Sequence, residues 1–368
     1  MARAGRARAT VRDVAAETGL SIATVSRVLN GGAGVAPHTR ELVLAAVERL
    51  GDQAPRPRAD PRADPRADPR AAQRADPRAD PRAASGPRQP LAGAVYVRCP
   101  YLLTDYFGLI VSSVGETIDL HGRQMILGAG EAAQDAAVLP GLPARPGVAG
   151  AILVLPPEPE EELARLRDRG FPFVVVDPRT RPPKDIPAVS AAHFAGGRAL
   201  MAHVTELGHR RVGIIGGPTR WLPSEARLAG YTASLAGAGV LPEPALLRSV
   251  PEPSAEHGYR AAGELLDLPE RPTALVAFND KMAVGALWAA AERGLRVPGD
   301  LSVAGFDDID VSRATTPPLT TVRQPLQEMG RMAVTLLMRL LSRHTVEALH
   351  VSLATELVVR GSTGPAPR

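Results

Sequence analysis

Proline recurs at nearly every fourth residue in residues 59–82, where the unit Ala-Asp-Pro-Arg occurs five times with one Ala-Ala-Gln-Arg interruption. Proline removes a backbone donor and clashes with the preceding helical turn, and each aspartate before it is pushed towards extended geometry. No Leu, Ile, Val, Met or aromatic residue occurs between Leu50 and Leu91, so this stretch cannot build a core. We therefore predict a disordered, polyproline-II-like linker at residues 51–90, with a folded part on either side.

The composition outside the repeat is that of ordinary folded protein. At 368 residues and 45% apolar content, the chain is long enough for two or three domains with buried cores. Its single cysteine, Cys99, excludes an internal disulfide and fits a reducing compartment. The first residues lack the apolar stretch of a secretory signal, and no run approaches the roughly 18 apolar residues of a membrane helix. We therefore expect a cytoplasmic protein with no membrane partner.

Positive charge gathers near the N-terminal end of the chain. Residues 1–50 carry seven arginines against four acidic residues, and residues 51–90 carry nine against six. The formal net charge of the whole chain is +4, so the remaining residues are slightly acidic. Only two of the 43 basic residues are lysines, which indicates a general bias towards arginine. The placement of the charge, more than its amount, favours a nucleic-acid-binding segment.

Residues 10–50 have the pattern of three short helices. Thr10 and Ser21 are N-cap residues for two helices separated by a turn at Gly19, and Pro37 opens a third helix. Their apolar positions predict a small shared core made of Val11, Val14, Ala15, Val25, Val28, Leu29, Leu42, Leu44, Ala45, Val47 and Leu50. The pattern alone leaves two interpretations open, a helical bundle without a nucleic-acid role and a helix-turn-helix DNA-binding headpiece.

The identity of the residues favours DNA binding. The stretch VRDVAAETGLSIATVSRVLNG, followed by VAPHTRELVLAAVERLG, closely resembles the headpiece of the lactose/galactose-repressor family of bacterial transcription factors. The resemblance implies that the second helix enters the major groove, with Arg27, Ile22 and Ala23 facing base edges. It implies phosphate contacts or helix capping at the positions Thr10, Ser21, Thr24, Ser26 and Asn30. Ala36 departs from the family, which usually has Ser or Thr at that cap.

From Leu91 onwards, short apolar runs alternate with amphipathic stretches. Runs such as AGAILVLP, FPFVVVD and TALVAFN are typical of parallel strands buried on both faces of a sheet. Helical stretches are predicted between the strands, at residues 107–120, 158–169, 194–207, 226–238, 255–268 and 281–293. This repeated order predicts a doubly wound α/β fold with parallel sheets, and the number of strands favours two lobes. Ligands of such sheets bind beyond the carboxyl ends of the strands.

The family resemblance extends through this region, in stretches such as ELGHRRVGIIGGP, PTALVAFNDKMAVGAL and GLRVPGDLSVAGFDDID. It implies a core similar to periplasmic sugar-binding proteins, with two lobes, a cleft and three chain crossings between the lobes. We expect a helix-turn-helix domain at residues 1–50 and an effector-binding and dimerisation domain at 91–362. The first lobe is expected at about 91–192 and 324–343, and the second at about 193–321 and 347–362.

The resemblance also marks effector-contacting positions, at Tyr106, Phe107, Phe194, Arg227, Asn279 and Asp307. A bidentate arginine with a carboxylate and an amide suits the vicinal hydroxyls of a saccharide. Two other interpretations stay open, because Asp307 and Asp308 also suit a helix-capping or hinge pair, and Phe107 and Phe194 also suit a core. The acidic residue that the family often has beside Phe194 is replaced by Ala195, so the ligand set differs from that of the best-known members.

No pattern typical of an enzyme is present. The stretch GIIGGP lacks the spacing of a phosphate-binding loop, and His193, His203 and His209 lack the spacing of a metal site. We therefore expect no catalytic residue, metal or cofactor. The resemblance implies a transcriptional regulator, and most members of the family are repressors. Such a regulator binds a near-palindromic operator as a homodimer and binds a saccharide or sugar derivative in its cleft. A purine- or nucleoside-responsive regulator and a sugar-binding module with impaired DNA coupling are the alternatives.

The repeat stands where the resemblance stops. In the family, the third helix is followed by a short hinge helix whose leucine inserts into the minor groove, but here Asp52 and the proline-rich repeat follow. Three interpretations are open: an expanded but tolerated linker, arginines that add affinity for phosphates, and a proline-rich segment that binds a partner. All three predict weaker coupling between effector and operator than in relatives with a hinge helix.

Replacing residues 52–90 with a standard hinge segment of the family tests this prediction. We expect the graft to enlarge the effector-induced change in operator affinity and to narrow the range of half-site spacings that are bound, because a short hinge joins the headpiece tightly to the lobes. Gel shifts on operators of varied spacing, with and without effector, measure both quantities. An unchanged effector response and spacing preference would show that the idea is wrong.

Overall fold

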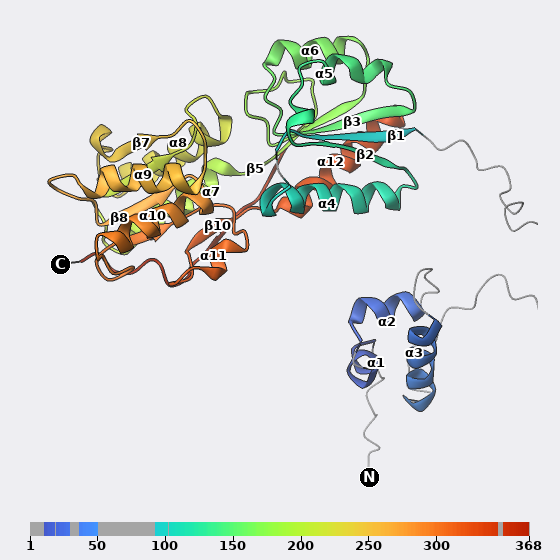
Figure 1. Ribbon diagram of the computed structural model, residues 1–368, viewed down its shortest axis with the longest axis horizontal. Coiled ribbons are helices and arrows are strands. Elements are labelled where there is room, and N and C mark those ends of the chain that lie inside the picture. Colours follow the sequence, from blue (N-terminus) through green and yellow to red (C-terminus); the bar gives the residue numbers. More distant parts are fainter. Residues whose placement is uncertain are drawn as a thin grey trace, which may run out of the picture. The chain divides into compact units, whose positions relative to one another are not determined.

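The computed structural model describes residues 11–18, 20–29, 37–50, 93–101, 103–344 and 349–367 (Figure 1). The chain divides into two compact units, Met1–Gly86 and Pro87–Arg368. The predicted disordered linker lies outside the described residues, as do the predicted DNA contacts Thr10 and Asn30. None of the helices in the described ranges is long and apolar enough to span a membrane.

Three helices make up the described part of the first unit: α1 (Val11–Thr18), α2 (Ile22–Leu29) and α3 (Pro37–Leu50). Ser21 caps α2, because its Oγ accepts a hydrogen bond from the Thr24 amide at 3.2 Å. The helices share a core of seven buried apolar residues, Val14, Ala15, Val25, Val28, Leu29, Val43 and Ala46. This unit is therefore the predicted three-helix headpiece.

The face that α3 buries differs from the prediction. Val43 and Ala46 are fully buried, whereas Leu42 and Leu44 are each 37% exposed and Ala45 is also exposed. Positions 43, 46 and 47 are spaced by three and four residues and so share one face of a helix. The predicted core positions at 42, 44 and 45 are wrong, because they lie outside this face.

The first lobe of the second unit is built on a six-stranded parallel sheet in the order β11-β5-β4-β3-β1-β2. Its strands are β1 (Ala94–Cys99), β2 (Met125–Ala129), β3 (Val148–Val154), β4 (Phe173–Val176), β5 (Ala188–Ala191) and β11 (His350–Leu353). Helices α4 (Asp105–Leu120) and α12 (Leu326–Leu341) cover one face, and α5 (Val138–Gly141) and α6 (Glu160–Asp168) cover the other (Figure 1).

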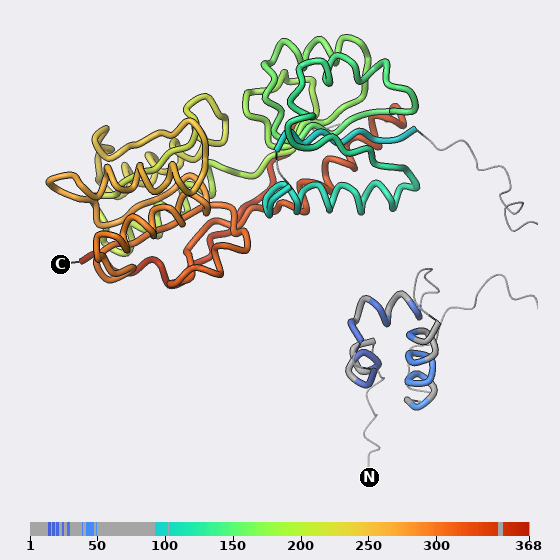
Figure 2. Tube along the Cα trace, viewed as in Figure 1, coloured from blue at the N-terminus to red at the C-terminus, as the bar shows by residue number. Residues whose placement is uncertain are grey.

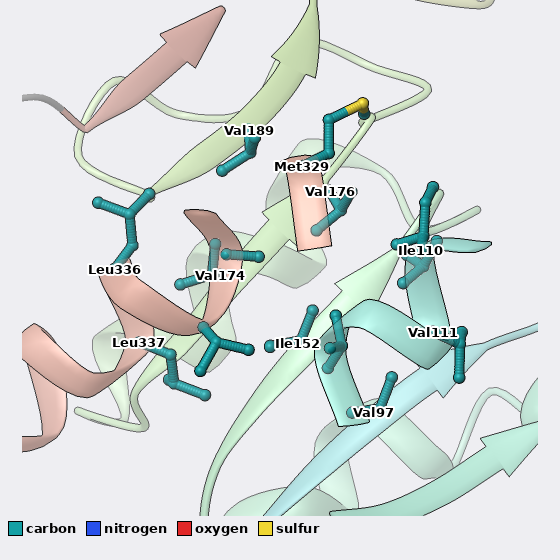
Figure 3. Close-up of a cluster of buried hydrophobic side chains, with 14 of the residues drawn as sticks. Val97, Ile110, Val111, Ile152, Val174, Val176, Val189, Met329, Leu336 and Leu337 are labelled. Carbon is teal, nitrogen blue, oxygen red and sulfur yellow. The ribbon is translucent and has the colours of Figure 1, made fainter. Parts of the chain in front are cut away.

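Alternate residues of the central strands face opposite sides of this sheet. Val97 and Ile152 pack with α4 and α12 in the core drawn in Figure 3. Their neighbours Tyr96, Ala151 and Leu153 belong to the separate core under α5 and α6. Because both faces are covered, most positions of such a strand are apolar, which explains the continuous apolar runs in the sequence, and the exception in β1, Arg98, is buried in an ion pair with Glu158.

The second lobe has a four-stranded parallel sheet in the order β7-β6-β8-β9. Its strands are β6 (Val212–Gly216), β7 (Leu247–Ser249), β8 (Ala274–Ala277) and β9 (Ser302–Ala304). Helices α7 (His193–Glu206) and α8 (Leu222–Gly237) cover one face, α9 (Ala255–Leu266) and α10 (Asp280–Glu292) cover the other, and the short α11 (Val311–Ala314) follows β9. The predicted two-lobed, doubly wound α/β fold is confirmed.

The chain crosses between the lobes three times, as the resemblance implies (Figure 2). The crossings lead from β5 to α7, from β10 (Thr321–Arg323) to α12, and from β11 to β12 (Glu356–Val358). Strands β10 and β12 pair antiparallel. Strand β11 pairs with β5, and its Val351 and Leu353 pack on the first-lobe core, so the prediction that residues 347–362 belong wholly to the second lobe is wrong.

Glycines set the distance between α9 and α10. A Cβ atom on Gly285 of α10 would lie 2.0 Å from the Ala255 carbonyl oxygen and 2.5 Å from the Tyr259 amide nitrogen of α9. A Cβ atom on Gly258 of α9 would lie 2.3 Å from the Met282 carbonyl oxygen. Backbone atoms cannot yield unless the helices separate, so only glycine permits this packing.

Replacing Gly285 with alanine is expected to lower the free energy of unfolding by ~1–3 kcal/mol, because the new methyl group forces α9 and α10 apart. Gly237→Ala is the matched control, since Gly237 is also helical but has nothing within 4 Å of its Cβ position. Urea unfolding of both variants and the wild type measures the effect. Equal losses of stability in the two variants would contradict this account of the helix contact.

Candidate functional site

A cavity of about 670 Å³ lies between the two lobes, at the carboxyl ends of their strands. The segments after β1, β2, β3 and β4 form one wall, and those after β7, β8 and β9 form the other, with the first turns of α4 and α8. Positive φ angles occur beside it at Leu155 (47°), Asp177 (50°), Asp307 (124°) and Asp308 (57°). Strained backbone of this kind concentrates at binding sites, where the surrounding fold holds it.

The structure brings five of the six predicted effector residues together: Tyr106, Phe107, Arg227, Asn279 and Asp307 all line the cavity. Asn279 also caps α10, because its Oδ1 accepts a hydrogen bond from the Met282 amide at 2.9 Å. That bond uses the carbonyl oxygen of the side chain and leaves its NH₂ group for other acceptors. Capping and lining are therefore compatible roles for Asn279.

Phe194 is not placed at the cavity, contrary to the prediction. It is absent from the lining and is 47% exposed on α7. Its neighbour His193, the first residue of α7, is buried. Consecutive residues of a helix point about 100° apart, so burial of His193 turns Phe194 towards solvent.

Arg227 is enclosed on several sides. Its Cζ lies 3.7 Å from the ring centre of Phe306 and 4.4 Å from that of Phe278, on which it makes cation–π contacts. It donates hydrogen bonds to the Phe278 carbonyl and, at 3.4 Å, to His193 Nδ1. Asp307 Oδ1 is 3.8 Å from its Nη2. These contacts offset the cost of burying a charge, since Arg227 is only 3% exposed.

Asp177 and His193 connect the two lobes through hydrogen bonds. His193 Nδ1 accepts from Arg227, so the ring proton lies on Nε2, which donates to Asp177 Oδ1 at 2.7 Å. The Tyr106 hydroxyl donates to Asp177 Oδ2 at 2.6 Å. The resulting chain, Tyr106–Asp177–His193–Arg227, runs from the first lobe to the second. We call it the interlobe chain.

The environment of Asp177 favours its charged form. Burial raises the pKa of Asp177, but the interaction with His193 and the hydrogen bond from Tyr106 outweigh burial and bring it below the usual value. Burial and the neighbouring Asp177 raise the pKa of Tyr106 well above its usual value, so its hydroxyl stays protonated and donates. Asp177 is thus a stable acceptor on the cavity lining.

Asp177 and His193 are not among the residues that the sequence predicts as a site. A partial signal exists for Asp177, which follows the buried run FPFVVV directly, just as Asn279 follows ALVAF. Polar residues at the carboxyl ends of parallel strands face the same edge of a sheet. No comparable signal marks His193, because its partners come from segments 16 and 34 residues away.

Asp307 is a buried acid whose charge is costly. Burial raises the pKa of Asp307 to about 6, although Arg227 and the Gln324 amide, which donates to it at 2.7 Å, oppose the rise. Asp280 is fully buried nearby, and burial together with Asp307 raises its pKa well above the usual range. The two carboxyl groups therefore do not readily carry two charges together.

The adjacent Asp307 and Asp308 have different surroundings. Asp307 lines the cavity, whereas Asp308 does not. Asp308 instead accepts hydrogen bonds from Ser312, Arg323 and Arg360. Arg323 and Arg360 belong to segments at or after the interlobe crossings, so Asp308 suits the structural role that the sequence leaves open for this pair.

The headpiece carries the candidate nucleic-acid interface on α2. The hydroxyl groups of Ser21 and Thr24 lie 2.9 Å apart at its start. Four further predicted contacts lie in α2 by their backbone, with side chains outside the described part: Ile22, Ala23, Ser26 and Arg27. Ser21, itself a predicted phosphate contact, caps the start of α2, and α2 carries most of the other predicted contacts.

Each of the two units matches a known protein family. Residues 10–51 match bacterial regulatory proteins of the lacI family, and residues 201–363 match a periplasmic binding protein-like domain. An HTH-type transcriptional regulator in the aml 5′ region of Streptomyces limosus is 35% identical over 361 residues, which cover 95% of this chain and 93% of that protein.

Two solved structures have the same fold. The transcriptional regulator CelR–cellobiose complex is 29% identical, with a TM-score of 0.68 over 96% of this chain and 100% of that one. The lac repressor dimer bound to operator and the anti-inducer ONPF is 27% identical, with a TM-score of 0.64 over 97% of this chain and 99% of that one.

A helix-turn-helix headpiece followed by a two-lobed core with an interlobe cavity defines a class of DNA-binding transcriptional regulators. The relatives across nearly the whole length of the chain are regulators of this class. The chain belongs to the LacI family of bacterial transcriptional regulators.

Asp307→Asn is expected to stabilise the protein at neutral pH by roughly 1–3 kcal/mol, because it removes a carboxylate whose pKa is raised from 3.8 to about 6. With a raised folded pKa, the native state binds the proton more tightly than the unfolded state does. The contribution of Asp307 to stability is therefore fully present below about pH 4 and is lost as pH rises through about 6.

Thermal unfolding of the variant and the wild type across this pH range measures the difference. The difference in stability between the variant and the wild type should disappear as pH falls towards 4. Asp310→Asn is the control, since the Asp310 side chain is 89% exposed. A gap that is independent of pH would contradict the prediction.

Proposed function

We propose that this LacI-family regulator is a repressor that binds a near-palindromic operator as a homodimer and responds to a saccharide in the interlobe cavity. The observation that carries the proposal is the interlobe chain, which links a first-lobe tyrosine to a second-lobe arginine beside the cavity. A ligand that bonds to both ends favours one orientation of the lobes over others. Where operator binding depends on that orientation, linkage makes effector and operator change each other's affinity by the same factor.

The cavity lining supports a saccharide as the effector. It combines the aromatic rings of Tyr101, Phe107 and Trp221 with polar groups on Arg227 and Asp307. A sugar ring offers apolar faces to the first kind of residue and hydroxyl groups to the second. A volume of about 670 Å³ suits a small-molecule ligand. The similar regulator CelR forms a complex with cellobiose, which supports the same ligand class here.

The headpiece supports operator binding. In this proposal α2 lies in the major groove, where Arg27 bonds to guanine and Ile22 and Ala23 contact neighbouring base edges. Phosphate contacts then come from the hydroxyl and amide side chains around α2: Thr10, Ser21, Thr24, Ser26 and Asn30. The similar lac repressor binds its operator as a dimer, which supports a homodimer and a two-fold symmetric site.

A gel shift on DNA upstream of the protein's own gene tests the proposal. Arg27→Ala is expected to weaken binding by ~1–3 kcal/mol and to relax the preference for guanine at one position of each half-site. Arg49→Ala removes an equal charge from the exposed end of α3, where Arg49 pairs with Glu17, and serves as the control. We expect it to weaken binding less and to leave the sequence preference unchanged.

A thermal-shift screen of saccharides identifies the effector, because a ligand that binds only the native state raises the unfolding temperature of the protein. The saccharide that stabilises the protein is then added to the gel shift. The stabilising saccharide should release the DNA. Saccharide binding without any shift of DNA at low salt would overturn the regulator role.

A further inference from the structure

The Arg179 guanidinium makes cation–π contacts with both lobes. Arg179 follows β4 in the first lobe, and its Cζ lies 4.8 Å from the ring centre of Tyr101. It also lies 4.4 Å from the ring centre of Trp221, which precedes α8 in the second lobe. The Arg179 carbonyl accepts a hydrogen bond from the Leu222 amide at 2.6 Å. The side chains of Tyr101, Arg179 and Trp221 all line the cavity.

The N–H groups of this guanidinium lack acceptors among the described residues. Its Nε is buried and has no hydrogen-bond partner there, and no carboxylate of those residues lies within 4.0 Å of it. Burial without a compensating acid lowers the pKa of Arg179 to about 10. The two Nη groups also have no partner among the described residues and, unlike Nε, are not closed off from solvent, so an acceptor supplied by a ligand can bind there.

The shape of the guanidinium restricts which acceptors suit Arg179. All its N–H groups lie in one plane, so it donates hydrogen bonds only along its edge. That edge presents parallel N–H groups, whose spacing matches the two oxygens of a carboxylate or a phosphate. A single hydroxyl group would use only part of the edge.

Two cations of the cavity lining, Arg179 and Lys281, form no ion pair with a carboxylate of the described residues. The two buried carboxylates of the lining have partners, Asp177 with His193 and Asp307 with Arg227. Lys281 donates to the Thr104 hydroxyl at 3.2 Å and makes no ion pair with a described carboxylate. The other carboxylates of the lining belong to exposed residues, where water screens them: Glu131 and Glu252.

We propose that Arg179 is a specificity-determining residue and that the effector is an acidic saccharide, whose carboxylate or phosphate binds the edge of the Arg179 guanidinium. The inference rests on the proposed function, since it concerns the same cavity. Arg179 of the first lobe and Lys281 of the second lobe both line this cavity, so an oxyanion bound there interacts with cations of both lobes. A neutral saccharide leaves the edge of Arg179 and Lys281 without a counter-charge.

Trp221 is a built-in reporter of this subsite. It is one of two tryptophans, and the other, Trp288, is exposed on α10 outside the cavity lining. The full-length Trp288→Phe protein therefore isolates the fluorescence of Trp221. Titrations compare glucose with glucuronate and glucose 6-phosphate, which share its ring but carry a carboxylate or a phosphate. Inorganic phosphate tests the subsite without a sugar, and sodium chloride at matched ionic strength controls for screening.

We expect the charged probes to change the Trp221 emission saturably and to bind roughly tenfold more tightly than glucose, as a charge-assisted bidentate contact provides. The probe that binds more tightly, glucuronate or glucose 6-phosphate, identifies the preferred oxyanion as a carboxylate or a phosphate. Arg179→Gln should weaken the charged probes roughly tenfold with little effect on glucose. Arg179→Lys keeps the charge without the planar edge and should restore only part of the affinity.

Arg220→Gln is the matched control, because Arg220 is an exposed neighbour of Trp221 that does not line the cavity. The proposal is overturned by any of three results: glucose binds as tightly as its charged counterparts, Arg179→Gln binds the charged probes like its parent, or the parent responds to none of them. Inorganic phosphate that binds through Arg179, together with saccharides that never bind, would overturn the saccharide effector and leave the oxyanion subsite in place.

Discussion

The buried guanidinium of Arg227 is the group on which the arrangement of the core depends. It is the second-lobe end of the interlobe chain, and it also holds the Phe278 carbonyl, next to the residue that caps α10. A charge with 3% exposure is tolerated only while its partners remain in place. Any movement of the lobes that separates Arg227 from His193 must therefore be compensated by new bonds, and a ligand in the cavity is placed to supply them.

The crossing segments are tied together a short distance away. Asp308 binds Arg323 of β10 and Arg360 beyond β12, so two of the three crossings share one buried carboxylate. Burial alone would raise the pKa of Asp308, but Arg360 and Arg323 lower it below the usual value, so this carboxylate stays charged. This carboxylate therefore holds the two crossing segments together beside the strained strand ends of the cavity.

The lining of the cavity is not optimised for stability. Asp307 is a buried acid with a raised pKa, and Arg179 has a buried N–H without an acceptor among the described residues. Apolar residues at these positions would make a more stable core, so their polar groups are best explained by binding. The close helix contact at Gly285 is different, because it involves backbone atoms and serves packing alone.

Local pattern was sufficient for the three-helix headpiece and the two-lobed α/β fold, because burial periodicity and capping depend on near neighbours. The positions Asn279 and Asp307 came from the family resemblance, and both line the cavity. The predictions were wrong for the buried face of α3 and for the place of Phe194, where a shift of one residue along a helix decides which side chain is buried. They were also wrong for β11, because the sequence does not say that this strand joins the edge of the first-lobe sheet beside β5. The sequence by itself determined the elements, their order and the family. Only the tertiary structure decided which polar groups meet, because His193, Arg227, Asp177 and Arg179 find their partners across two lobes, at separations along the chain that no local pattern records.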